Sequence, residues 1–557
     1  MTKLCYLQKW LLGLSLGLLA VPLHAQVEAE DLPPVSRSYV LTNVFLHPQP
    51  GELIEGATVL IEDGLITAVG TDVRIPGEAT RVEADSLHVY AGFIDGLSQL
   101  GIKEKKDEDR ERPDDPGNPP PAQAGIQPQR LALDLMDASS SDIEKLRASG
   151  FAVSHVVPMG GMLPGQGALV QLGGQDADAM RLRQPASLFV QYEGAGRMYP
   201  SNLLGVMATF KQMYRQAVYA MAHEVNYQAD PAGLARPAYD RTVQALYPVV
   251  ERELPAMFLT PKRKDVHRAL ALREELGFPL ALAGVQEGSY VVEALAGQDL
   301  PVFLSLELPD KPEEMEEDTT LTELERNERA ALVQRRQEAY EQAIGQAQQL
   351  HAAGVTFGFA SYDLSGKDVP DHLRRLVAET ELTEEAALAA LTTDAAALLG
   401  LSGQLGTVEP GKIANLVVSE QPYFAEKAKV RMVFVDGMPY EVEKRKKSSG
   451  KGVSVLGTWA YTVESPQGKS GGNIVFTGDQ SAPEGTITSE RTDRATDLED
   501  IFVDGNQLSF SFSFSAGGGS IDIEVSVEID GETFEGNISY GTYGTFPIEG
   551  ERTEKPE

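Results

Sequence analysis

The chain has 557 residues, of which 42% are hydrophobic, so it can bury a large core and is long enough for two or more domains. It carries 48 basic and 82 acidic residues, which gives a formal net charge of -34. Such a surface repels phosphate backbones and anionic lipids, so we expect no nucleic-acid partner and no attachment to an acidic membrane surface.

The first 25 residues are typical of a signal peptide. Lys3 and Lys9 precede an apolar run from Trp10 to Leu23, and Ala25 is the small residue that a signal peptidase requires at its cleavage site. The run is shorter than the about 20 residues of a membrane helix, and no other stretch qualifies, so we expect no membrane span. We therefore expect residues 1–25 to be removed and the mature protein to be periplasmic or secreted.

Cysteine usage agrees with export to a Gram-negative periplasm. The only cysteine, Cys5, precedes the apolar run, so the mature chain would contain no thiol. A core of this size needs no disulfide bonds, and a chain without thiols cannot use a cysteine nucleophile or a thiolate metal site.

Short strands are expected directly after a polar leader. Residues 39–44 and 57–70 have the apolar and β-branched composition of strands. Asp63 and Gly64 supply the turn of a hairpin inside the second segment, because both residue types tolerate positive φ.

Residues 90–99 contain Gly92 and Asp95 within an apolar run, which predicts the first strand of a barrel. The segment resembles the Gly-apolar-apolar-Asp-x-His-x-His pattern of the amidohydrolase superfamily through these two residues. Leu97 and Gln99 stand where that pattern has its two histidines. Side chains two residues apart lie on one side of a strand, so the histidines would hold a metal ion that activates water. This chain lacks the pair.

Other segments extend the resemblance over most of residues 38–440. Residues 38–91 and 403–443 are similar to the two halves of the small β-sandwich that flanks amidohydrolase barrels, although Asn415 replaces the usual Asp. Residues 199–205, Tyr-Pro-Ser-Asn-Leu-Leu-Gly, resemble the Tyr-Pro-Ser-x-Leu-Met-Gly motif of a secreted, imidazolonepropionase-like subgroup.

The resemblance implies an α/β fold with a TIM-like (β/α)8 barrel over residues 92–402. A charged, proline-rich segment at 103–129 is expected to be a long loop at the barrel mouth. The further expected elements are helix 141–150, strands 151–158 and 168–172, helix 209–228, a solvated acidic helical segment at 312–353, the last barrel strand at 353–363 and a helix at 383–401.

The resemblance also implies metal ligands on later barrel strands: a carboxylated Lys or Glu on the fourth, single histidines on the fifth and sixth, and an Asp on the eighth. In strand order, this chain has Gln191 or Glu193, Leu259, Ala283 or Gly284, and Asp363 at these positions. Only Asp363 matches, and zinc needs three or four side-chain ligands. We therefore expect neither a bound metal nor another cofactor.

Few other residues are candidates for chemistry. Asp363 alone as an acid or base is worth about 10²- to 10⁴-fold, far less than amide hydrolysis needs, so it is a weak catalytic candidate or a structural cap after the strand. His155 lies on a strand and is expected to be a hydrogen-bonded core residue. The histidines expected on helices are His223, His267, His351 and His372.

Two functions from different classes follow. In the first, the chain is an exported amidohydrolase-like protein with a degenerate site, which binds a small molecule or a protein partner without catalysis. In the second, it is a hydrolase that acts on carbon-nitrogen bonds other than peptide bonds, with an unusual or metal-free site or with zinc.

The C-terminal part of the chain has a different sequence pattern. A basic linker, residues 444–452, precedes residues 453–557, in which apolar and polar residues alternate strictly over 508–514 and 521–529. This alternation predicts a separate antiparallel β domain, a sandwich or a barrel with a lipocalin-like layout.

Overall fold

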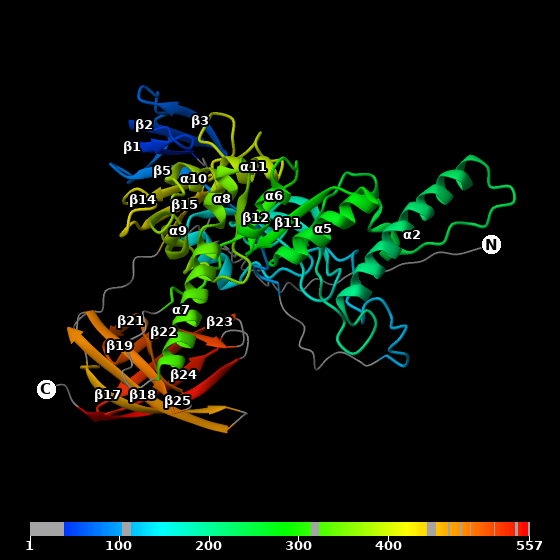
Figure 1. Ribbon diagram of the computed structural model, residues 1–557. Coiled ribbons are helices and arrows are strands. Elements are labelled where there is room, and N and C mark those ends of the chain that lie inside the picture. The colour runs from blue at the N-terminus through cyan, green and yellow to red at the C-terminus, as the bar shows by residue number, and fades with distance from the viewer. Residues whose placement is uncertain are drawn as a thin grey trace, which may run out of the picture.

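The computed structural model describes residues 38–102, 113–312, 322–442, 453–465, 468–479, 482–490, 492–516, 519–540 and 544–554. The predicted signal peptide and the basic linker lie outside these ranges. The described chain forms three sheets: a small mixed sheet, a sheet surrounded by helices, and an antiparallel sheet near the C-terminus (Figure 1). Among the described residues, no helix is long and apolar enough to cross a bilayer.

The small sheet combines strands from two distant parts of the chain. They are β1 (Ser38–His47), β2 (Ile54–Glu62), β3 (Leu65–Gly70), β4 (Thr80–Val82), β5 (His88–Ala91), β14 (Leu416–Ser419), β15 (Val430–Val435) and β16 (Met438–Glu441). Their order is β16-β15-β14-β5-β1-β2-β3, with β4 also paired to β1. The antiparallel pair of β5 and β14 joins the two parts. The two parts thus share one hydrogen-bonded sheet, whereas the sequence predicted a sandwich.

Local turn chemistry explains the hairpin in this sheet. Asp63 and Gly64, with φ of 48° and 82°, connect β2 to β3 as predicted. One face of the sheet buries an apolar cluster that includes Val59, Leu416 and Phe434. The sheet therefore has its own core, to which both parts of the chain contribute.

The central sheet is a nearly closed barrel. Its strands are β6 (Phe93–Ser98), β7 (Phe151–Val156), β8 (Gly165–Gln171), β9 (Arg181–Val190), β10 (Ala256–Leu259), β11 (Leu280–Val285), β12 (Val302–Ser305) and β13 (Gly358–Ala360), hydrogen-bonded in chain order. Seven of them run parallel, but β8 is antiparallel to both β7 and β9. Because Pro158 and the positive-φ residues Gly160 and Gly161 reverse the chain after β7, no helix separates β7 from β8. The regular (β/α)8 alternation is wrong at this point.

Hydrogen bonds bring the first and last strands of the barrel together. The backbone N–H of Ser361 donates to Oδ1 of Asp95 over 2.8 Å. The N–H of Tyr362 donates to the carbonyl of Leu97 over 3.1 Å. These bonds join residues just beyond β13 to β6 and close the barrel.

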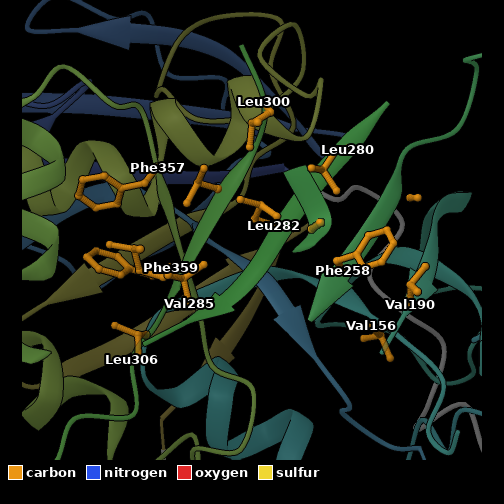
Figure 2. Packing of buried hydrophobic residues seen from close by; sticks show 14 of the residues in the cluster. Val156, Val190, Phe258, Leu280, Leu282, Val285, Leu300, Leu306, Phe357 and Phe359 are labelled. Carbon is orange, nitrogen blue, oxygen red and sulfur yellow. The ribbon is translucent and has the colours of Figure 1, made fainter. Parts of the chain in front are cut away.

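Alternating side chains divide the apolar residues of the barrel into two clusters. One lies between the strands and the surrounding helices and includes Phe258, Leu282 and Phe359, which project from three strands in Figure 2. The other fills the barrel and includes Leu97 and Phe303. The ring of Phe303 takes up the space beside Gly96, where an added Cβ would lie 2.0 Å from it. The barrel interior is therefore a packed apolar core.

The helices are α1 (Ser141–Ala148), α2 (Leu203–Ala229), α3 (Arg241–Gln244), α4 (Tyr247–Val250), α5 (Arg263–Leu276), α6 (Val292–Leu295), α7 (Glu323–Ile344), α8 (Gln346–Ala352), α9 (Val369–Ala378), α10 (Glu384–Leu391) and α11 (Thr393–Leu398). α2 starts earlier than predicted, because the side chain of Asn202 caps it through the N–H of Gly205. The helix expected at 383–401 is interrupted at Thr392, whose ψ is -86°. The strand expected at 353–363 is limited to β13, which pairs with β12 only over its three residues.

The C-terminal sheet consists of β17 (Gly457–Ser465), β18 (Gly468–Asp479), β19 (Ala482–Ser489), β20 (Thr492–Asp497), β21 (Glu499–Asp504), β22 (Gln507–Ala516), β23 (Gly519–Asp530), β24 (Thr533–Ser539) and β25 (Thr545–Glu554). Every pair is antiparallel, as predicted. Its edges approach each other, since β19 contacts β21 and β20 contacts β22. Trp459 is fully buried in its core, beneath the guanidinium of Arg552. This curled single sheet is closer to the predicted barrel than to a sandwich.

Candidate functional site at the mouth of the barrel

Polar side chains gather where the parallel strands of the barrel end. Gln99 follows β6, Glu193 follows β9, Gln286 follows β11, Glu307 follows β12 and Asp363 follows β13. In barrels of this kind the loops after the strands form the functional face. The mouth formed by these five residues is therefore the candidate location of a functional site.

The sequence predicted Asp363 on the last barrel strand. In the structure it lies in the turn after β13. Its φ is 65°, a conformation that Asp tolerates better than most residues. Its side chain reaches solvent, yet the surrounding protein displaces enough water to raise its pKa to about 6, and the negative charge of Glu307 adds to this effect. At neutral pH this carboxylate is mostly ionised and can accept a proton.

Neighbouring groups couple to Asp363. The side-chain amide of Gln286 donates to Oε2 of Glu307 over 2.9 Å, while burial raises the pKa of Glu307. Burial, followed by the charges of Asp363 and Glu193, raises the pKa of the Tyr362 phenol, which is hydrogen-bonded to Gln99. Tyr362 therefore stays protonated and can donate a hydrogen bond at the mouth.

A cavity of about 810 Å³ opens beside these groups, between the ends of β11 and β12 and helix α7. Its size is suited to a small molecule. It is lined by residues of both charges and by polar side chains, among them Gln286, Glu307, Lys311, Arg336, Tyr340 and Gln346. A second cavity, about 850 Å³, lies at the opposite end, where Leu280 begins β11 and Pro301 precedes β12. The cavity at the mouth is the better candidate because it adjoins the coupled groups.

Apolar packing occupies the positions where the sequence comparison placed metal ligands. Leu97 and Ala283 belong to the apolar cluster inside the barrel, and the partly buried Leu259 packs against it. Gly284 has a φ of 66°, and a Cβ added to it would lie 2.8 Å from Cδ1 of Leu259. Ala283 is therefore the residue of β11 that faces the interior, while Leu259 occupies the space that a side chain at 284 would need.

The two candidates after β9 differ in their surroundings. Gln191 is buried, and its amide donates to the carbonyl of Gly161 over 3.3 Å. Glu193 is exposed at the mouth. Within the ranges that the structure describes, no group of three or more His, Cys, Asp and Glu side chains is arranged to hold a metal ion.

Asp95 of β6 is buried below the mouth and is hydrogen-bonded to β7 and to the residue that follows β13. Its carboxylate accepts hydrogen bonds from Oγ of Ser154 over 2.6 Å and from the N–H and Oγ of Ser361 over 2.8 and 2.9 Å. Burial raises its pKa to about 6, and these bonds limit the increase. It has no access to solvent, so its role is to close the barrel.

One histidine adjoins the mouth groups: Nδ1 of His372 is 3.1 Å from the backbone nitrogen of Leu308 and 2.8 Å from the carbonyl oxygen of Leu306, and His372 limits the rise in the pKa of Glu307. His155 is buried, its Nε2 is 3.0 Å from Oγ of Ser187, and burial lowers its pKa to about 3, so it is a neutral core residue as predicted. The four histidines expected on helices lie there: His223 on α2, His267 on α5, His351 on α8 and His372 on α9.

Sequence reasoning missed several residues of this site. Glu307, Gln286 and Tyr362 were not singled out, and neither was the wall that α7 contributes to the cavity. Glu307 could have been found, because it directly follows the apolar run of residues 301–306 at the carboxyl end of a parallel strand. The side chains on α7 could not, because that helix has little apolar periodicity to indicate which of its sides faces the strands.

Comparisons with known proteins agree with this architecture. Residues 301–440 match the model of the amidohydrolase family. The chain is similar to the crystal structure of an amidohydrolase from Thermotoga maritima, with 22% identity and a TM-score of 0.59 over 72% of this chain and 100% of that one. It also matches the crystal structure of a putative prolidase from Bifidobacterium longum, with 14% identity and a TM-score of 0.40 over 72% and 94% of the two chains. A search of curated protein sequences gives no match. Residues 301–440 thus match the amidohydrolase family, and the fold is similar to that of the Thermotoga maritima structure.

Proposed function

We propose that the barrel binds a polar small molecule at its mouth and has lost the metal-dependent hydrolysis of the amidohydrolase fold. The observation that carries this proposal is the burial of Leu97 inside the barrel and the packing of the partly buried Leu259 against the same apolar cluster, at positions where the resemblance implies nitrogen ligands. Leucine has no lone pair to offer a metal. Leu259 also fills the space beside Gly284. A histidine at position 284 could not be accommodated without rearrangement, which supports the same conclusion.

The donors that remain do not fit a zinc site. Zinc takes three or four ligands at about 2.0–2.3 Å, mostly imidazole or thiolate. The mouth offers the carboxylates of Asp363, Glu307 and Glu193, of which Asp363 and Glu193 are exposed. Glu307 already accepts a hydrogen bond from Gln286. These residues therefore do not form a zinc site.

The cavity supports binding of a polar ligand. Lys311 and Arg336 supply positive charge and Glu307 negative charge, while Tyr340 supplies an aromatic ring. Such a lining is suited to a small molecule that carries both charges. A few polar groups around an otherwise ordinary pocket are enough to fix the orientation of a ligand.

A hydrolase that acts on carbon-nitrogen bonds is the second candidate. It is favoured by Asp363, whose pKa of about 6 suits a general base near neutral pH. The name amidohydrolase on the Thermotoga maritima structure points in the same direction. A base alone gives about 10²- to 10⁴-fold acceleration, so this candidate requires a further source of catalysis.

We also propose that the protein works in the periplasm or outside the cell. The basic n-region, the short apolar run and Ala25 support this location. The acidic composition keeps such a protein soluble.

The test combines metal content with ligand binding. Elemental analysis after purification in buffer containing zinc or manganese should show no stoichiometric metal. A thermal-shift screen of amino acids and other small zwitterions should give ligands whose effect is lost in Arg336→Glu and kept in Arg273→Glu, which changes the opposite cavity. Stoichiometric metal, together with amidase turnover that Asp363→Asn abolishes, would refute the proposal and establish the hydrolase.

A further inference from the structure

Helix α2 is attached to the barrel by only part of its length. The ring of Phe210 packs 5.3 Å from that of Phe258, and Lys211 and Arg215 form ion pairs with Glu275 of α5. All buried residues of α2 lie before Val218. Figure 1 shows the rest of the helix projecting away from the barrel, followed by a segment that returns toward it. We call residues 218–229 the outer half of α2.

Exposed apolar side chains are concentrated around this helix. Twelve large apolar side chains are exposed in the described parts of the chain. Seven of them lie between residues 199 and 239: Tyr199, Leu204, Val218, Tyr219, Val225, Leu234 and Tyr239. Tyr219 and Val225 are 73% and 65% exposed on the outer half itself. Patches of this kind mark surfaces that another molecule covers.

The exposed side of α2 has the spacing of a coiled-coil seam. Positions alternate by four and three residues through Leu204, Ala208, Lys211, Arg215, Val218, Ala222, Val225 and Ala229. This is the a/d pattern of helices that pack lengthwise. None of these residues is buried, and the residues that face the barrel occupy the opposite side of the helix. Lys211 and Arg215 are held by Glu275, so the uncharged seam belongs to the outer half.

Charges are turned away from this seam. Apart from two tyrosines, the ionisable side chains of the outer half are His223 and Glu224, and both contact other parts of the chain. Nε2 of His223 is 2.9 Å from the carbonyl of Ala235, and the hydroxyl of Tyr247 donates to Glu224 over 2.8 Å. The residues that flank the seam are Tyr219, Met221, Asn226 and Gln228, all uncharged.

A second copy of this chain is the partner that this surface fits. We propose that two copies pair through the outer halves of α2, antiparallel about a two-fold axis. That arrangement sets Val218 opposite Ala229 of the second copy and Ala222 opposite Val225, so each large side chain meets a small one. Two chains of net charge -34 repel each other over most of their surface, and the uncharged seam lets them approach without facing like charges.

The size of the surface sets the expected strength of pairing. At about 1.5 Å per residue, the outer half is about 18 Å long. A stable interface buries about 800 Å² on each partner, more than one short helix face supplies. The returning segment, with exposed Leu234 and Tyr239, has to contribute. We therefore expect a reversible dimer whose dissociation constant is in the micromolar range.

Sedimentation equilibrium of the full chain tests the pairing. The wild type should fit a monomer-dimer equilibrium, and both Val225→Glu and Ala222→Glu should raise the dissociation constant on the order of 100-fold or more, because each dimer would bury two unpaired carboxylates. The matched control is Leu332→Glu, which adds the same charge at an exposed apolar residue of α7 and should leave the equilibrium unchanged. All three positions are exposed, so the circular dichroism of the variants should match that of the wild type.

Crosslinking tests the orientation. In chains with Cys5 replaced by Ser, a mixture of Ala222→Cys and Val225→Cys proteins should form disulfide-linked heterodimers, whereas Ala222→Cys alone should not crosslink. A crosslink formed by Ala222→Cys alone would show parallel helices and overturn the two-fold arrangement. A wild type that stays monomeric at its highest soluble concentration, or a dimer that neither glutamate variant weakens, would overturn the pairing itself.

Discussion

Replacing the buried Asp95 by Asn should change how the stability of the barrel depends on pH. In the wild type, burial raises the pKa of this carboxyl from 3.8 to about 6. Asn keeps the shape and still accepts the hydrogen bond from the N–H of Ser361. Its amide can donate to the hydroxyls of Ser154 and Ser361, because a hydroxyl can also accept. Asp95→Asn should therefore fold, with a neutral group in place of a titrating one.

The sign and size of the effect follow from the pKa. The folded protein holds the Asp95 proton more tightly than the unfolded chain does, so protonation stabilises the wild type fully below pH 3.8, and this contribution is lost as the pH rises through about 6. The rise in this pKa from 3.8 to about 6 corresponds to about 3 kcal/mol in the free energy of unfolding. Between neutral pH and about pH 5, the wild type should regain about 1.4 kcal/mol of this stabilisation by protonation of Asp95.

Urea unfolding at neutral pH and at about pH 5 measures this contribution. The helical circular dichroism signal reports the barrel, because the described helices all lie between residues 141 and 398. The free energy of unfolding of the wild type, minus that of Asp95→Asn, should rise on acidification. The control is Asp72→Asn, which removes the same charge from an exposed position. A difference that stays flat, or falls, as the pH is lowered would refute the role assigned to burial of Asp95.

Three further predictions concern the packing and the ends of the chain. Gly284→Ala should destabilise the barrel by about 1 kcal/mol or more beyond Gly297→Ala, since both have positive φ but only the first meets Leu259; equal melting temperatures would contradict the packing argument. The exported protein should begin at or near Gln26, and an intact mass that retains the predicted signal peptide would disprove this. Residues 453–557 should melt cooperatively when expressed alone, and limited proteolysis of the whole protein should cut the basic linker; a fragment without a β signal would show that it depends on the barrel.

The location of the site within the fold was accessible from the sequence, but its composition was not. Leu97 and Leu259 could be identified as unusual because they stand at fixed positions of a recognisable strand pattern. Asp363 could be placed near the mouth for the same reason. The coupling of Asp363 to Glu307, and the contact between Leu259 and Gly284, depend on how neighbouring strands are staggered. No pattern within one strand contains that information.

The sequence by itself determined the local structure: the hairpin at Asp63 and Gly64, the alternating strands near the C-terminus and most helices, because φ preferences and apolar periodicity act over a few residues. Only the tertiary structure decided that β8 runs antiparallel, that Asp95 closes the barrel and that half of α2 is uncovered. The bond from Ser361 to Asp95 spans 266 residues. Such contacts form because the chain must close a sheet and satisfy a buried carboxylate at the same place, and both requirements arise only once distant segments have packed together.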